Sequence, residues 1–144
     1  MAFNTIYDIA GSAMRAQTVR LNTVASNMAN ANSASGTEEG AYRALKPVFS
    51  TIYQSLETTA SSGQRMAGAS VGIAGVTESD RAVEQRYEPG SPLADDNGYV
   101  YYSNVNVVEE MADMMSASRT FQTSVDVITR VNSMQQGLLR LGQS

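Results

Sequence analysis

The apolar residues of the chain form two long periodic stretches, one at each end. In residues 105–141 they recur at alternating steps of four and three, the heptad pattern of a helix that lies along another helix. This stretch contains no proline. Its one glycine, Gly137, lies near the C-terminal end. We predict a C-terminal helix over 105–141, capped by Ser103 or Asn104. At about 1.5 Å per residue it would be roughly 50 Å long and would need a partner along most of its length.

The heptad positions of this stretch change register once. They run through Val107, Met111, Met114, Ser118, Phe121, Val125 and Ile128, and then continue one position early through Val131, Met134, Leu138 and Leu141. Such a shift either changes the local winding or presents a second face to a second neighbour.

Residues 3–31 predict a second long helix with the same periodicity, capped by Asn4 or Thr5. Its heptad positions are Phe3, Tyr7, Ala10, Met14, Gln17, Leu21, Val24, Met28 and Ala31, and only Gln17 is polar. A further apolar stripe on a neighbouring face comprises Ile6, Ile9, Ala13 and Ala16. Because one partner helix covers one stripe, we expect two neighbours around the first half of this helix.

The middle of the chain has the pattern of short strands separated by turns. Its expected parts are a loop at 32–41, an edge strand at 42–53 that contains Pro47, a mobile loop at 54–70, a weak strand at 71–76 that continues through 83–87, and a strand at 99–102. The sequence Asp96-Asn97-Gly98 before the last strand predicts a hairpin with a type I′ turn, which needs positive φ angles.

The predicted fold is therefore mainly α with a small β part. The long N- and C-terminal helices pair as an antiparallel coiled coil, and a small β-rich body lies between them in sequence. The expected domains are 1–34 and 105–144, which form a helical core, and 35–104, which form the β-rich middle.

Two helices with more apolar surface than one contact can cover predict association, since soluble monomers seldom expose large apolar patches. We expect an assembly interface formed by Phe3, Tyr7, Ala10, Met14, Leu21, Val24, Met28, Val107, Met111, Met114, Phe121, Val125, Ile128, Val131, Met134, Leu138 and Leu141.

Composition narrows the functional classes. The 144 residues include no cysteine and no histidine, so there is no disulfide, no thiolate ligand and no imidazole base. The formal net charge of −4 argues against a nucleic-acid partner. No apolar run approaches the roughly 18 residues of a membrane span. The N-terminus also lacks the pattern of a cleavable secretory signal.

The acidic and sulfur-containing residues have ordinary structural explanations. The pairs Glu38-Glu39, Asp95-Asp96 and Glu109-Glu110 are adjacent in sequence and point apart, so none is a ready acid/base pair. The run ADDNG lacks the acidic spacing of a calcium loop, and the methionine cluster at 111, 114 and 115 is typical of packing. We therefore expect no catalytic residue, no cofactor and no metal ion, and hence no enzyme.

Three stretches, taken together, resemble one known family. The first is FNTIYDIAGSAMRAQTVRLNTVASNMANANSASG with Tyr42-Arg43 after it, the second is YEPGSPLADDNGYV, and the third is SNVNVVEEMADMMSASRTFQTSVDVI. In order, they resemble the flagellar axial proteins and specifically the proximal-rod proteins of the FlgC type. The clearest marks are the Asn-Ala run from Ser26 to Asn30, Glu109-Glu110-Met111, and the sequence Arg119 to Gln122. The loop NSASGTEEGAYR departs from the compact Thr-Pro-Gly-Tyr turn of many relatives.

The resemblance implies a structural subunit of the bacterial flagellar basal-body rod that stacks helically through its terminal helices and transmits torque for motility. It implies a periplasmic location and export through the flagellar type III apparatus. The implied partners are copies of the chain, other proximal and distal rod proteins, and the membrane-ring base. An alternative that the residues leave open is a coiled-coil subunit of another secretion-type filament or an adaptor complex.

Overall fold

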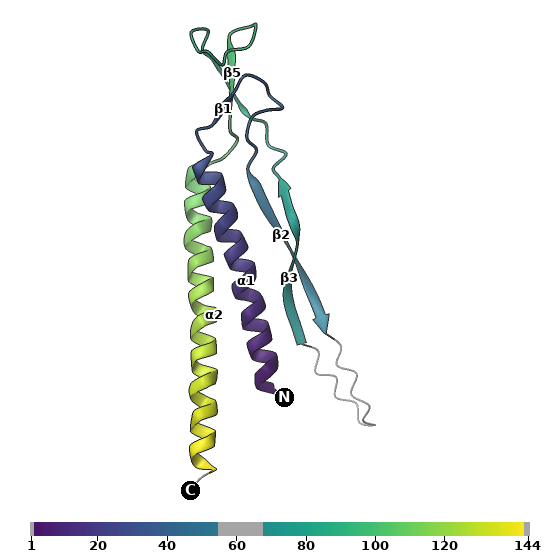
Figure 1. Ribbon diagram of the computed structural model, residues 1–144, viewed down its shortest axis with the longest axis vertical. Coiled ribbons are helices and arrows are strands. Elements are labelled where there is room, and N and C mark those ends of the chain that lie inside the picture. Colours follow the sequence, from purple (N-terminus) through teal and green to yellow (C-terminus); the bar gives the residue numbers. More distant parts are fainter. Residues whose placement is uncertain (1, 55–67, 143–144) are drawn as a thin grey trace.

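The chain forms an elongated body of two long helices and two small sheets (Figure 1). This computed structural model describes residues 2–54 and 68–142. The elements follow the order α1, β1, β2, β3, β4, β5, α2, so the helices enclose the β elements in sequence, as predicted. The prediction of a mainly α fold with a small β part is confirmed.

The two helices lie side by side and run in opposite directions. Helix α1 spans Ala2–Ala29 and helix α2 spans Val107–Leu141. The end of α1 lies beside the start of α2, and the C-terminal end of α2 extends past the start of α1 (Figure 1). Both helices were predicted to within about two residues at each end, the accuracy with which helix ends are defined.

The predicted caps were wrong by two or more residues. Asn106, not Ser103 or Asn104, caps α2, because its side chain accepts hydrogen bonds from the N–H groups of Val108 and Glu109. At the other end of the chain, Asn4 and Thr5 lie inside α1, which begins at Ala2.

The face of α2 that meets α1 is a continuous heptad seam. Helix α1 is the only described element with which α2 has extensive contact, so shielded side chains mark this face. Apart from the half-buried Ser118, they follow steps of four and three over most of the helix: Glu110, Met114, Ala117, Phe121, Ser124, Ile128, Val131 and Gln135. This set is called the seam below.

Only some of the predicted heptad positions of α2 belong to the seam. Met114, Phe121, Ile128 and Val131 belong to both, but Val107, Met111 and Val125 lie beside the seam and stay exposed. Ala117 is fully buried in their place. Small side chains such as Ala117 and Ser124 let two helices approach closely, and hydrophobicity alone does not reveal this preference.

A long hairpin of β2 and β3 covers a second side of α1. Strand β2 spans Leu45–Gln54 and pairs antiparallel with β3, Gly68–Glu78, with an irregularity at Val48 and Phe49. Both strands contact α1, which therefore lies between α2 and the hairpin. The Ser12 hydroxyl, buried in α1, accepts a hydrogen bond from the Val71 N–H group at 3.2 Å. Helix α1 thus has two neighbours, α2 and the hairpin, although Ile6, Ile9 and Ala13 of the stripe from which the second neighbour was predicted line an open groove.

Three short strands form a separate sheet beyond the ends of the helices. Strands β1 (Ala34–Ser35), β4 (Glu84–Tyr87) and β5 (Tyr99–Tyr102) pair antiparallel in the order β1-β5-β4. This sheet and its loops form the tip at the upper end of the molecule (Figure 1). Val100 of the central strand is 1% exposed and is the core of the tip.

Three predictions for the β region require correction. Strand β3 does not continue through 83–87, because the chain leaves it after Glu78 and enters the other sheet as β4. The type I′ turn is absent, since Gly98 has a φ of 82° while Asn97 is not left-handed, and residues 88–98 form a longer connection. Of the predicted loop at 54–70, Gln54 ends β2 and residues 68–70 begin β3; the remainder, 55–67, lies outside the described residues.

Candidate assembly interface

A buried asparagine joins the end of α1 to the start of β2. Asn27 is 1% exposed. Its side chain donates to the Leu45 carbonyl at 2.9 Å and accepts from the Leu45 N–H group at 2.8 Å. The Tyr42 hydroxyl donates to the same oxygen of Asn27 at 3.0 Å and lies 3.2 Å from the Ser26 hydroxyl. Asn27 thus acts on β2 as a neighbouring strand would, through paired amide hydrogen bonds.

A second asparagine holds the start of α2 to the same region. The Asn104 side chain accepts from the Ala44 N–H group at 2.7 Å and donates to the Arg81 carbonyl at 2.7 Å. The Ser103 N–H group donates to the Ser33 carbonyl at 3.2 Å. Together, Asn27, Tyr42 and Asn104 fix the angle between the helix pair and the β elements. We call these three residues the junction.

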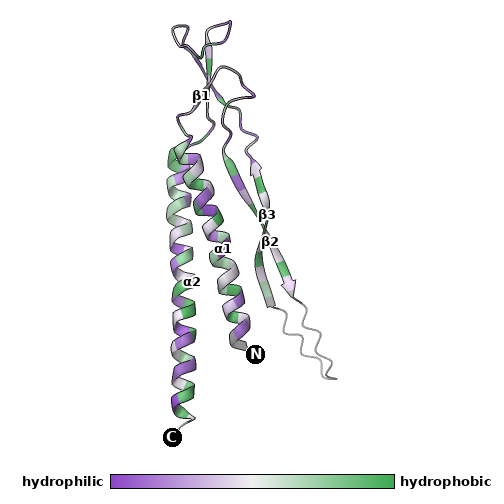
Figure 2. Cartoon of the chain, in the orientation of Figure 1, coloured by the Kyte–Doolittle hydropathy of each residue, from purple (hydrophilic) through white to green (hydrophobic). Residues whose placement is uncertain are grey.

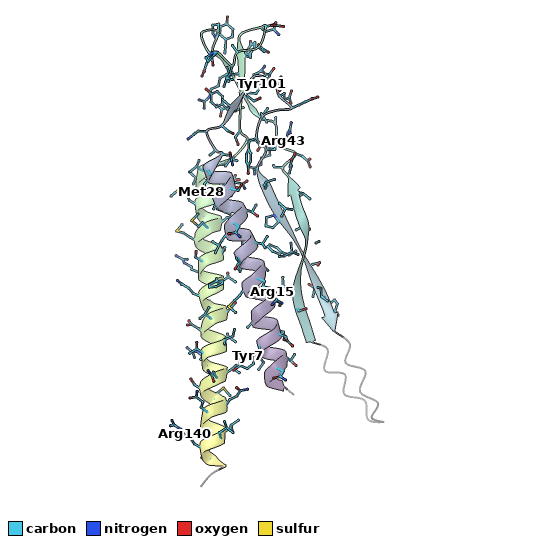
Figure 3. All side chains as sticks on the ribbon, in the orientation of Figure 1. Tyr7, Arg15, Met28, Arg43, Tyr101 and Arg140 are labelled. Carbon is cyan, nitrogen blue, oxygen red and sulfur yellow. The ribbon has the colours of Figure 1, made fainter. Side chains whose placement is uncertain are left out.

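Polar contacts across the two helices are few and lie far apart. Arg20 in α1 forms an ion pair of 2.6 Å with Asp113 in α2 near the junction. The Tyr7 hydroxyl donates to the Gln135 side chain at 3.2 Å near the start of α1; Tyr7 extends from the lower end of α1 toward α2 (Figure 3). Between these contacts the two helices meet mainly through small and apolar side chains.

Many residues of the predicted assembly interface are left uncovered in the single chain. Those with exposed side chains are Val107, Met111, Val125, Met134, Leu138 and Leu141. The half-buried ones are Tyr7, Met14, Leu21, Met28, Met114, Phe121 and Ile128, and the buried ones are Ala10, Val24 and Val131. Phe3 lies in α1, but its side chain is outside the described part.

The structure adds exposed apolar residues that the predicted interface did not include. On α2 these are Val108, Met115, Val127 and Leu139, and on α1 Ile9. Hydrophobic residues recur along α2 down to its C-terminal end (Figure 2). The heptad count missed them because it follows one stripe, whereas α2 carries apolar residues on both sides of its seam.

An apolar groove runs between the lower half of α1 and α2. It is lined by Ile6, Ile9, Ala10, Ala13, Thr123, Ser124 and Val127. Ile9 and Val127 at its sides are 38% and 39% exposed. The second apolar stripe predicted on α1, with Ile6, Ile9 and Ala13, therefore faces this groove rather than a helix of the same chain.

The first acidic residue of the ADDNG run has a structural role. Asp95, in the ADDNG run, accepts hydrogen bonds from the N–H groups of Tyr99 at 2.8 Å and Asn97 at 2.9 Å. The bond from Tyr99, with that from Asn97, holds the pKa of Asp95 below its ordinary value. Its carboxylate thus organises the loop before β5. Within residues 2–54 and 68–142, no three acidic side chains come close enough together to hold a metal ion.

The tip carries an exposed cluster of aromatic and charged side chains. Tyr87 and Tyr99 pack edge to face with ring centres 5.3 Å apart, and the Arg86 guanidinium lies 4.6 Å from the centre of the Tyr102 ring. Arg86 also pairs with Glu84 at 2.9 Å, and this hydrogen bond lowers the pKa of Glu84. The tyrosines of β4 and β5 thus pack within the sheet of the tip.

Comparison with known proteins decides the family. A family described as "Flagella basal body rod protein" matches residues 8–36, and one described as "Flagellar basal body rod FlgEFG protein C-terminal" matches residues 96–141. Flagellar basal-body rod protein FlgC of Salmonella typhimurium is 48% identical over 143 residues, 99% of this chain and 100% of the relative. The FlgC proteins of Escherichia coli O157:H7 and Yersinia enterocolitica are 47% and 43% identical over the same shares. The chain belongs to the FlgC family of flagellar basal-body rod proteins.

FlgC-family membership confirms the resemblance predicted from the sequence. The chain is a structural subunit of the flagellar basal-body rod, part of the machinery of motility, and not an enzyme. The Asn-Ala run and Tyr42 that carry the resemblance are the residues that meet at the junction. In the described part of the chain no helix is long and apolar enough to cross a membrane.

Proposed function

We propose that this rod subunit assembles helically through its terminal helices and that the assembled rod transmits torque across the periplasm. The observation that carries the proposal is the exposed apolar surface of α2, with Leu138, Leu139 and Leu141 between 55% and 75% exposed at its end. Fully burying a leucine side chain is worth about 1.5–3 kcal/mol. Covering these residues with neighbouring subunits therefore gives a strong drive to associate.

The same contacts account for a stiff rod. Each buried side chain contributes little, but helices with apolar residues on several sides share contacts with several neighbours at once. Bending or twisting the assembly would separate many such contacts together. The single chain does not need this surface for its own fold, because the seam already holds α2 against α1.

The pairing of α1 and α2 is proposed to be an antiparallel coiled coil. The seam supports this, since its residues keep steps of four and three from Glu110 to Gln135. On this basis residues 1–34 and 105–144 form the helical core of the rod and residues 35–104 its β-rich outer part. The junction would then hold the outer part at a constant angle to the core.

For the partners and the export route, family membership supports an inference that the geometry does not address. We infer that the subunit contacts copies of itself, other proximal and distal rod proteins and the membrane-ring base. It would reach the periplasm through the flagellar type III export apparatus.

Substitution of Leu138 by Asp tests the assembly role. Leu138 is 55% exposed, so Leu138→Asp should leave the helix content and unfolding of the isolated chain unchanged. In cells whose own copy is deleted, it should abolish swimming and rod incorporation, because a carboxylate would be buried between subunits. The matched control is Gln136→Asp, which places the same charge on an exposed position two residues away. If cells with Leu138→Asp swim like the control, the end of α2 is not an assembly surface.

A further inference from the structure

The sequence contains one Asn-Gly pair, Asn97-Gly98, and it lies in the connection between β4 and β5. Asn97 is exposed and Gly98 is half-buried. Because glycine has no side chain, its backbone nitrogen can come close to the side-chain amide of the asparagine before it. Asparagine followed by glycine is for this reason the pair that loses its side-chain amide most readily.

The loss of the amide is a ring closure followed by hydrolysis. The backbone nitrogen of Gly98 forms a bond to the side-chain carbonyl carbon of Asn97, Cγ, and the bond from Cγ to Nδ2 breaks. The attacking nitrogen gives up its proton, Nδ2 leaves as ammonia, and a five-membered succinimide remains. Water then opens this ring at either of its carbonyl carbons and leaves aspartate or isoaspartate at position 97. In sum, a water molecule is consumed and an ammonia molecule is released.

In the folded chain, Asp95 holds the attacking nitrogen in a hydrogen bond. The Gly98 N–H group donates to the backbone carbonyl of Asp95 at 2.9 Å. The carboxylate of the same residue accepts from the N–H groups of Asn97 at 2.9 Å and Tyr99 at 2.8 Å. A nitrogen that donates a hydrogen bond must release it before it can lose its proton and attack, so local opening of the loop has to precede the reaction.

Gly98 is also held by the residues around it. Its carbonyl accepts a hydrogen bond from the Glu88 N–H group at 2.9 Å, and its φ is 82°. A Cβ atom at this position would meet the Tyr87 ring at 2.9 Å and Pro89 at 3.2 Å. Substitution of Gly98 would therefore strain the loop, so the hydrogen bonds are better tested at Asp95.

We propose that Asn97 is a site of spontaneous deamidation and that Asp95 slows the reaction by holding the loop closed. Isoaspartate would lengthen the backbone by a methylene group between Asp95 and Tyr99, so that one carboxylate could no longer accept from the N–H groups of residues 97 and 99 together. Either product also adds a carboxylate beside those of Asp95 and Asp96. Deamidation thus loosens the start of β5, whose Val100 is the core of the tip.

Ageing of the purified full-length chain tests this proposal independently of assembly. The unaltered chain, Asp95→Ala and Asp96→Ala would be incubated at mildly alkaline pH, both folded and in guanidinium chloride. Peptide mapping by mass spectrometry would measure aspartate and isoaspartate at position 97 over time. Asp96→Ala is the matched control, because it removes the same charge from the adjacent residue, which is exposed and takes no part in these hydrogen bonds.

The folded chains are expected to differ in rate. Asp95→Ala should deamidate at Asn97 roughly tenfold or more faster than the unaltered chain, because it removes two hydrogen bonds to a carboxylate. Asp96→Ala should stay within about twofold of the unaltered chain. In guanidinium chloride all three chains should react at similar and faster rates. Amides of β5 should exchange hydrogen faster in the aged chain than in the fresh one.

Several results would overturn the proposal. The absence of product at position 97 even in guanidinium chloride would show that Asn97 is not a deamidation site. An unaltered folded chain that reacts as fast as the unfolded one, or a folded Asp95→Ala chain that reacts as slowly as the unaltered chain, would show that Asp95 does not protect the site. Equal acceleration by Asp96→Ala would assign the effect to charge rather than to the hydrogen bonds.

A second variant covers the case in which Asp95→Ala unfolds the chain, which loss of helical circular dichroism would reveal. Asp95→Ser keeps a hydroxyl group that can accept one of the N–H groups. Its rate should lie between those of the unaltered folded chain and the unfolded chain. A rate equal to that of Asp96→Ala would contradict the role of Asp95.

Discussion

The two ends of the helix pair differ in how they are held. At the junction, Asn27 is 1% exposed and the amide of its side chain pairs with the backbone of Leu45. At the opposite end, Leu139 and Leu141 are 68% and 75% exposed. The junction is complete within one chain, whereas the lower end exposes surface that none of the described residues covers. The subunit thus separates a region that fixes its own shape from a region that can bind its neighbours.

The largest expected effect on the isolated chain comes from removing the Asn27 amide. Asn27→Ala should lower the free energy of unfolding by about 2–4 kcal/mol, because it removes the partner of both the N–H and the carbonyl group of Leu45 and one of the two partners of the Tyr42 hydroxyl. Urea denaturation followed by circular dichroism measures this. The control Asn22→Ala, at an exposed site on the same helix, should change stability by less than about 0.5 kcal/mol. Equal effects from both variants would show that the junction is not what holds the upper end.

A smaller effect, of the opposite sign, is expected at the lower end. A Cβ atom added to Gly137 would meet none of the described residues of the chain within 4 Å. Gly137→Ala should therefore stabilise the isolated chain by about 0.5–1 kcal/mol through helix propensity. If the same variant impairs swimming, a neighbouring helix approaches closely at Gly137 in the rod. A loss of stability in the isolated chain would contradict the open surroundings of this residue.

The smallest effect is expected from the ion pair between the helices. Arg20 and Asp113 have side chains that are 26% and 54% exposed, so solvent screens their attraction. A double-mutant cycle with Arg20→Ala and Asp113→Ala should give a coupling of about 0.2–1 kcal/mol, falling as salt is added. A coupling that is larger and insensitive to salt would mean that charge, rather than the apolar seam, holds the helices together.

Sequence periodicity was sufficient to predict the two helices but not the face that each presents. Proline-free heptads over 105–141 predict a helix whatever its surroundings. The choice of Ala117 over Ser118 for the seam depends on how closely α1 can approach, and this is a property of the pair. The same limit explains why the groove at Ile9 and Val127 was not predicted as a unit, since its two sides come from opposite ends of the chain.

The junction was visible in the sequence only through resemblance. Asn27 lies one position before Met28 in the heptad of α1 and has no feature that predicts burial. Its role depends on Tyr42 and Leu45, which return to it after a loop of irregular sequence. Similarly, β3 and β4 could not be separated in advance, because the residues between them, 79–83, have no proline or glycine to mark the break.

Hydrogen exchange of the isolated chain and of the assembled rod tests the central claim most directly. The account predicts that amides around Asn27, Leu45 and Asn104 are protected in both states. Amides after the seam, in residues 136–141 of α2, should exchange rapidly in the dilute chain and become protected in the rod, because neighbouring subunits cover them. Equal protection of residues 136–141 in the dilute chain and in the rod would contradict the claim that this end is completed by assembly.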